Sequence, residues 1–122
     1  MKTLQKQSEQ YLDLINTYKK EGKAIAHFNI SNLDQARAIV QVAEELKQPV
    51  IIGASEGERE YMGIAMVRTI VDELNQEYNV PIFLNADHTY SLEKVQEVVE
   101  AGYDSVIVDG AKLPYEENVA LV

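Results

Sequence analysis

Apolar residues along this chain follow two spacings, and the alternation between them predicts short strands separated by amphipathic helices. Four continuous apolar runs predict buried strands at 24–30, 50–54, 80–86 and 104–110. Between and around these runs, apolar positions recur at helical spacing, which predicts helices over 1–20, 31–48, 55–78, 91–102 and 114–122. An N-terminal helix is therefore followed by four strand–helix units.

Residue types at the predicted helix ends support these limits. Ser31 and Ser55 stand where two helices begin, and both are side chains that cap a helix N-terminus. Glu58 follows Ser55 at the spacing of a capping box. Gly22 follows the helix over 1–20 and Gly102 is the last residue of the helix over 91–102, and glycine commonly ends a helix.

Continuous apolar strands with short helical connections are typical of a parallel sheet flanked by helices. Two architectures fit this pattern: an open doubly wound sheet, or half of a (β/α)8 barrel. No G-x-G-x-x-G follows a strand and no Walker A sequence occurs, so nothing in the sequence supports a nucleotide site.

The predicted strands become polar at their C-terminal ends. Because side chains alternate between the two faces of a strand, the polar residues can be assigned to one face. The residues on that face are Ile25, His27 and Asn29; Ile51, Gly53 and Ser55; Phe83, Asn85 and Asp87; and Ser105, Ile107 and Asp109. In parallel α/β sheets and barrels, ligands bind at this end of the strands.

Asp87 and His88 are the most informative of these polar residues. Ser55 as a helix cap, Asn29 as a turn residue, Asp109 in a turn with Gly110 and His27 as a core histidine each have an ordinary structural explanation. The Asp–His pair is harder to explain in this way, because a capping Asp needs no His beside it and the next helix already has Ser91 as a cap. The His could bind a metal while the Asp transfers a proton, or the Asp could orient the His as a base, and sequence order leaves both open.

Composition limits the class of partner. The chain has 20 acidic and 11 basic residues, a net charge of −9, which disfavours nucleic acid. There is no cysteine, no signal peptide pattern and no apolar run long enough to span a bilayer. We therefore expect a cytoplasmic protein with no membrane partner.

Two stretches, "AHFNISNLDQARAIVQVAEELKQPVII" and "NADHTYSLEKVQEVVEAGYDSVIVDGAKLPYEENVALV", resemble the N-terminal half of the class II, metal-dependent fructose-bisphosphate aldolase family. The resemblance runs in register through all four strand–helix units. It implies an α/β fold, the N-terminal half of a (β/α)8 TIM barrel preceded by a helix. It also implies a glycolytic carbon–carbon lyase, a homo-oligomer that cleaves a ketose 1,6-bisphosphate to dihydroxyacetone phosphate and glyceraldehyde 3-phosphate.

The resemblance also implies roles for individual residues. His88 matches a Zn²⁺ ligand, and Asp87 matches the aspartate that exchanges a proton with the hydroxyl at the bond being broken. Asn29 and Ser55 match residues that line the substrate end, and Asp109 matches an aspartate near the metal. Departures from the family pattern are His27, the loop "GASEGEREYMG", and Ala111 and Lys112, which replace a serine and a histidine common after the strand-four aspartate.

Counting residues implies that residues 1–122 form a partial TIM-barrel domain truncated at its C-terminus. A complete barrel needs roughly 250 residues, and the family's metal site uses three histidines, two of them in the C-terminal half. The chain holds two histidines, and His27 matches no ligand position. Activity is therefore expected to depend on the missing half.

Two other functions remain as alternatives. One is a non-catalytic half-barrel that self-associates to cover its open sheet edges, and that could pool two His88 residues on one metal. The other is a different α/β enzyme that uses the Asp87–His88 pair without a metal. A Schiff base on Lys112 ranks below both.

Overall fold

The computed structural model describes residues 4–122 of the chain, so residues 1–3 of the first predicted helix lie outside the described residues. Its elements, in chain order, are α1 (Leu4–Glu21), β1 (Ala26–Asn29), α2 (Leu33–Leu46), β2 (Val50–Ser55), α3 (Glu56–Met62), α4 (Ile64–Glu77), β3 (Ile82–Thr89), α5 (Leu92–Glu100), β4 (Ser105–Val108) and α6 (Tyr115–Leu121). The predicted strand–helix alternation is confirmed.

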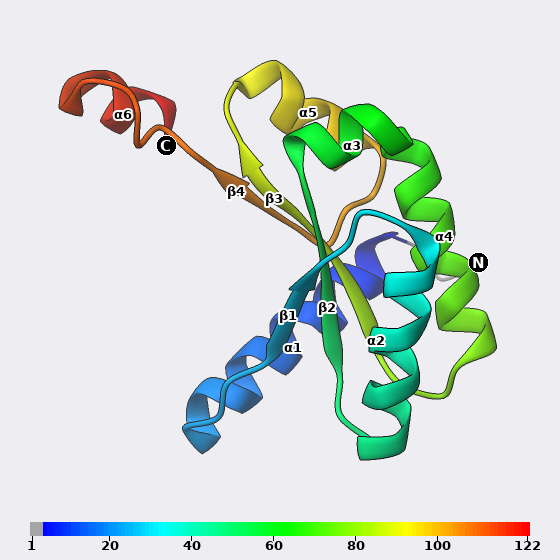
Figure 1. Ribbon diagram of the computed structural model, residues 1–122. Helices are drawn as coiled ribbons and strands as arrows, with labels where there is room; N and C mark the ends of the chain where they lie inside the picture. The colour runs from blue at the N-terminus through cyan, green and yellow to red at the C-terminus, as the bar shows by residue number, and fades with distance from the viewer. Residues whose placement is uncertain (1–3) are drawn as a thin grey trace.

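The four strands form one parallel sheet in the order β1-β2-β3-β4. Each crossover advances the chain in the same direction across the sheet, and crossovers of one hand place their helices on one face. Figure 1 shows α2, α3, α4 and α5 together on that side. A doubly wound sheet would reverse its strand order and place helices on both faces. The sequential order is instead that of a barrel wall.

The hydrophobic core lies between this face of the sheet and the helices. Alternate residues of β2 and β3, among them Ile52 and Leu84, are fully buried there. They pack with residues from the helical layer such as Val40, Val71 and Leu74. The other face of the sheet is apolar at its amino end, where Ile51 and Phe83 are buried, and polar toward its carboxyl end.

Helix α1 covers the amino end of that other face (Figure 1). The Tyr11 ring lies 5.2 Å from the Phe83 ring, centroid to centroid. At its two ends α1 reaches the loops before β2 and β4: the Tyr18 hydroxyl donates to Gln48, and the Gln7 amide donates to Asp104. These contacts place the helix across the amino ends of the strands.

Three local predictions were wrong. The cap of α2 is Asn32, whose side chain accepts from the Gln35 amide, and not Ser31. The helix predicted over 55–78 divides into α3 and α4 at Gly63, whose φ of 90° is unfavourable for any residue with a side chain. Strand β3 extends to Thr89 and so includes Asp87 and His88, which a strand over 80–86 leaves out. Among the described residues no helix is long and apolar enough to cross a membrane.

Candidate active site

Two short hydrogen bonds connect four of the residues singled out in the sequence. The Asn29 side-chain amide donates to Asp87, with Nδ2 2.7 Å from Oδ2. The His88 ring nitrogen Nδ1 lies 2.7 Å from Oδ2 of Asp109. Both bonds lie at the carboxyl ends of the strands. The structure therefore brings Asn29, Asp87, His88 and Asp109 together at the expected edge of the sheet.

The backbone is irregular where Asp87 and His88 occur. The β3–β4 register shifts between Ala86 and Thr89, and His88 has a φ of 46°. A bulge of this kind turns a side chain away from the regular alternation of the strand. The imidazole of His88 can then reach Asp109, which lies just beyond β4, while Asp87 stays in register with Ser55.

The contact with Asp109 determines the tautomer of His88. Backbone donation from Ala111, followed by the bond to His88, lowers the pKa of the Asp109 carboxyl, so this group is an ionised acceptor. A carboxylate accepts and does not donate, so Nδ1 of His88 carries a proton and a neutral ring keeps its lone pair on Nε2. Nε2 lies 3.8 Å from Oδ1 of Asp87.

This arrangement fits a metal-ligating histidine. Such histidines usually donate their second ring N–H to a carboxylate, which sets the ring orientation and raises its basicity. His88 has such a carboxylate and a 53% exposed side chain. Within residues 4–122, no three His, Asp or Glu side chains converge on one point. The described residues thus provide one ligand with its supporting carboxylate.

Gly53 makes room for the contacts that cross β2. A Cβ atom at Gly53 would lie 2.3 Å from Oδ1 of Asn29 and 2.5 Å from Cε1 of His27. Since Asn29 reaches across β2 to Asp87, and His27 reaches across it to Asn85 with Nε2 3.2 Å from Oδ1, both bonds depend on the missing side chain.

A second polar row lies one step below the first on the same face. His27 contacts Asn85, and the Asn85 amide donates to Ser105 with Nδ2 2.8 Å from Oγ. The interpretation of His27 as a core histidine was wrong, because β1 is exposed along its whole length. The predicted parity of polar positions is seen in these contacts on β1, β3 and β4.

Ser55 has the structural role that its capping box predicted. Its hydroxyl accepts from the Glu58 amide, with N 3.4 Å from Oγ, at the start of α3. Ser55 also pairs with Asp87 in the β2–β3 register, so it stands beside the site. Lys112 lies over the Tyr90 ring, 5.4 Å from its centroid, in a cation–π contact.

Sequence reasoning missed the contribution of α3. Arg59 is 2% exposed and donates to the carbonyl groups of Ala54, Asp87 and His88 and to the Thr89 hydroxyl. An arginine in a capping-box helix is ordinarily solvated, so its sequence context carries no signal for this burial.

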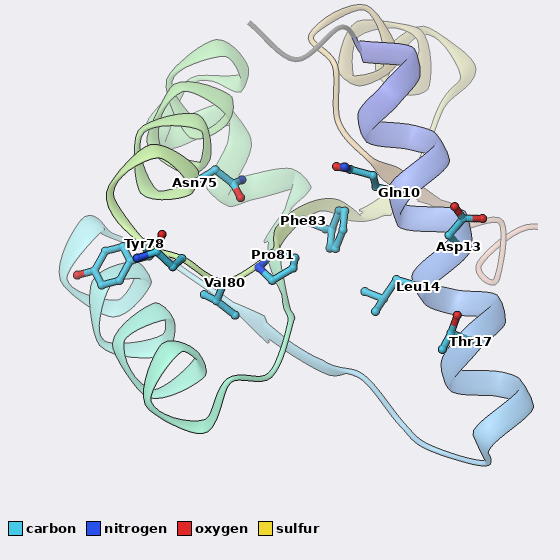
Figure 2. Close-up of a pocket in the computed structure, with 10 residues that line it drawn as sticks. Gln10, Asp13, Leu14, Thr17, Asn75, Tyr78, Val80, Pro81 and Phe83 are labelled. Atoms are coloured by element: carbon cyan, nitrogen blue, oxygen red, sulfur yellow. The ribbon is translucent and has the colours of Figure 1, made fainter.

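A cavity lies at the other end of the sheet. It has a volume of about 540 Å³ and lies between α1 and the segment that enters β3 (Figure 2). Leu14 and Phe83 face each other across it. None of Asn29, Asp87, His88 and Asp109 lines this cavity. They pair at the carboxyl edge of the sheet instead.

Comparison with known proteins identifies the family of the chain. The family described as fructose-bisphosphate aldolase class-II matches residues 9–122. A relative from Bacillus subtilis (strain 168) is 42% identical over 113 residues, and the fructose-bisphosphate aldolase of Geobacillus stearothermophilus is 38% identical over 114 residues. These matches cover 88% and 89% of this chain, and the chain spans 39% of the length of each relative.

Solved structures show the same fold. The YdjI aldolase from Escherichia coli K12 is 29% identical, with a TM-score of 0.77, and the match covers 87% of this chain and 41% of that one. The fructose-bisphosphate aldolase of Campylobacter jejuni, 22% identical, has the same fold with a TM-score of 0.77 over 93% of this chain and 40% of that one. The four-stranded sheet with its helices therefore matches part of aldolase TIM barrels.

Proposed function

The chain belongs to the class II fructose-bisphosphate aldolase family, and from that premise we propose that it is the part of a zinc-dependent aldolase holding the proton-transfer carboxylate and one metal ligand. The substrate is a ketose 1,6-bisphosphate, cleaved to dihydroxyacetone phosphate and glyceraldehyde 3-phosphate. The observation that supports this most is the pairing of Asn29 with Asp87 and of His88 with Asp109 at the carboxyl ends of the strands.

Asp87 is the proton acceptor in the cleavage direction. Its carboxylate takes the proton of the hydroxyl next to the breaking carbon–carbon bond, and that carbon becomes the aldehyde. The electron pair of the bond stays with the three-carbon ketone phosphate, which is then protonated. Asn29 donates to one oxygen of Asp87, so it orients the carboxylate. Asn29 and Ser55 stand at the substrate end of β1 and β2.

His88 is the Zn²⁺ ligand contributed by these residues. Asp109 holds the ring by Nδ1, which leaves Nε2 as the nitrogen that would bind the metal. When bound, zinc supplies Lewis acidity toward the substrate ketone. The remaining ligands and the phosphate-binding loops are proposed to come from the rest of the barrel, so the chain alone is expected to show no EDTA-sensitive cleavage of fructose 1,6-bisphosphate.

A chimera tests this proposal directly. Residues 1–122 replace the matching N-terminal segment of the Geobacillus stearothermophilus aldolase, and cleavage is measured with and without EDTA. Asp87→Asn should lower kcat by about 10²–10⁴-fold with the zinc content unchanged, because it removes one proton-transfer group. His88→Ala should lose zinc, whereas the matched control His27→Ala should keep it. Full activity in Asp87→Asn, or zinc retained by His88→Ala, would contradict the assignment.

A second candidate function is a non-catalytic half-barrel that self-associates. Its supporting observation is the exposure of apolar side chains on the outer strands, with Phe28 of β1 51% exposed and Ile107 of β4 42% exposed. Within the described residues β1 pairs only with β2, and β4 only with β3, so each strand has a free edge. The assembly state of the chain in solution distinguishes this candidate from the aldolase.

A further inference from the structure

Arg59 is a buried cation directly behind the Asp87–His88 segment. It lies in α3, is 2% exposed, and directs its guanidinium to the carboxyl ends of β2 and β3. Nη1 donates to the Ala54 carbonyl and, at 3.1 Å, to the Asp87 carbonyl. Nη2 donates at 2.8 Å to the Thr89 hydroxyl and approaches the His88 carbonyl at 3.5 Å. Three of these four acceptors belong to consecutive residues of β3.

The β-bulge explains why such a donor is needed at this position. Asp87 and His88 fall inside the register shift between β3 and β4, and the β2–β3 register ends at Asp87. The regular ladder therefore offers His88 no partner, and a partly buried backbone carbonyl without a donor is costly. The Arg59 guanidinium supplies donors to both carbonyls. The ladder resumes beyond the bulge, where the Asp109 amide donates to the Thr89 carbonyl at 2.8 Å.

We propose that Arg59 is the positioning residue of this site: through the Asp87 and His88 carbonyls it holds the bulge that aims the Asp87 carboxylate and the His88 ring. Its catalytic consequence rests on the function proposed above. Arg59 touches neither substrate nor metal in this scheme. It acts through the backbone of the two residues that do.

Helix α3 also binds Tyr90, the residue that follows Thr89. Glu56, at the start of α3, accepts from the Tyr90 amide with Oε2 3.0 Å from N. Arg59 and Glu56 together bind the backbone or side chains of residues 87–90. A planar guanidinium presents five N–H groups in a fixed fork, so one side chain can serve acceptors on two strands. A lysine at this position could serve fewer of them.

Arg68 provides a matched control within the chain. It is 7% exposed, lies in α4, and donates at 3.2 Å to the Gly102 carbonyl and to Asp104, at the amino end of β4. Arg68 is thus a buried arginine that secures the fold at the opposite end of the sheet from the site. Replacing either arginine removes a buried cation, but only Arg59 contacts the Asp87–His88 segment.

Histidine NMR tests the proposal, because the chain has only two histidines. In protein labelled with ¹⁵N and ¹³C at histidine, Arg59→Met should shift the ring and Cα/Cβ signals of His88, which report its positive φ. The His27 signals should stay in place, because His27 contacts Asn85 and not Arg59. Arg68→Met should leave the signals of both histidines at their wild-type positions. Arg59→Lys should shift His88 in the same direction as Arg59→Met, by less.

Each outcome bears on the proposal. His88 signals that stay at wild-type positions in a folded Arg59→Met or Arg59→Lys variant would overturn it, as would an equal shift in Arg68→Met. If neither Arg59 variant folds, the NMR signals of the wild-type guanidinium test the proposal. Nη groups bound by four acceptors should give separate, slowly exchanging signals. A freely rotating Arg59 would overturn the proposal without any variant.

The readout is independent of catalysis. If the chimera described above lacks aldolase activity while Arg59→Met still moves His88, the positioning role stands and the proposed function fails. If the chimera is active, Arg59→Lys in it should lower kcat about 10–100-fold with KM little changed, the usual effect of removing a partner that orients a metal ligand. If the chimera is active but Arg59→Met leaves the His88 signals unchanged, the positioning role of Arg59 fails and the proposed function stands.

Discussion

At the scale of single residues, the site depends on a glycine, Gly53, at a position where a side chain would not fit. Gly53 lies on the inner face of β2, directly between Asn29 and Asn85 in the sheet register. A strand interior usually disfavours glycine, because it has no side chain to pack and loses more entropy on ordering. Here its absence of a side chain lets Asn29 and His27 cross β2 to partners on β3.

Gly53→Ala should therefore disrupt these contacts. The new methyl group would overlap the tips of Asn29 and His27, and relief requires at least the Asn29–Asp87 bond to open. We expect a loss of about 1–3 kcal/mol in the free energy of unfolding, typical of overpacking, measured by urea denaturation. Gly57→Ala is the control, since nothing lies within 4 Å of a Cβ there. It should gain at most about 1 kcal/mol. Equal effects of the two substitutions would refute this account of Gly53.

Tyr103 predicts how stability depends on alkaline pH. Burial raises the pKa of its hydroxyl from 10.0 to about 12, and the hydroxyl donates to the Ile64 carbonyl. A folded pKa above the unfolded one gives stability that is fully present below pH 10 and is lost as the pH rises toward 12. Two pKa units correspond to about 3 kcal/mol.

Denaturation of the wild type and Tyr103→Phe across this range measures the effect. The phenylalanine variant should be less stable by about 1 kcal/mol at neutral pH, where it lacks one hydrogen bond. Its disadvantage should vanish and reverse above about pH 10, where Tyr103 ionises in the unfolded wild type but stays protonated in the folded protein. A constant difference in unfolding free energy between the two proteins from neutral to strongly alkaline pH would show that folding does not raise the pKa of Tyr103.

At the scale of secondary structure elements, α3 is the short helix that connects the fold to the site. It begins directly after β2 at the Ser55 cap and ends at Gly63, and it faces the carboxyl end of β3. Lys94 of α5 reaches back to Glu56 and Glu60 of α3, so the two helices on either side of the Asp87–His88 segment are joined. The break at Gly63 lets α3 and α4 run in different directions, which one continuous helix over 55–78 would not allow.

The N-cap of helix α2 can be tested, because the sequence and the structure assign it to different residues. Asn32 is the cap, with Oδ1 2.9 Å from the Gln35 amide, whereas the exposed Ser31 hydroxyl contacts Glu58. Asn32→Ala should cost about 1 kcal/mol of stability in urea denaturation because it leaves a helix N–H without its partner. Ser31→Ala should stay within about 0.5 kcal/mol of the wild type. The reverse order of effects would restore the expectation drawn from sequence.

At the scale of the whole molecule, the sheet has two free edges and an inner face that is only partly covered. Helix α1 covers the amino end of that face, while the polar rows around Asn85 and Asp87 lie beyond it. Helix α6 extends beyond β4 and contributes no buried residue among those described (Figure 1). Exposed edge strands are templates for pairing with another chain.

We expect the 122-residue chain to self-associate, and sedimentation equilibrium measures this. Phe28→Lys places a charge on the β1 edge and should shift the equilibrium toward monomer, because edge lysines oppose strand pairing. Tyr61→Lys is the control, since Tyr61 is 85% exposed on α3, away from both edges. A stable, folded monomer at all concentrations would argue against association through these edges and against the self-associating half-barrel.

How much of the site was predictable depends on the range of the interactions involved. The parity of polar positions along each strand is a local property, and it correctly placed Asn29, Asn85 and Asp87 on one face. The bulge at His88 was not predictable, because it arises from the mismatch between β3 and β4 and from donors on another helix. Arg59 had no local signal for the same reason.

The sequence by itself determined the strand–helix alternation, the parallel sheet and the residues that gather at its carboxyl edge, because periodicity and helix capping act within a few residues. Only the tertiary structure decided how those residues pair. Asn29 pairs with Asp87, His88 with Asp109, and Arg59 with the bulge. These hydrogen bonds join residues that are 21 to 58 positions apart in the chain. Such contacts exist only once the sheet register brings the strand ends together.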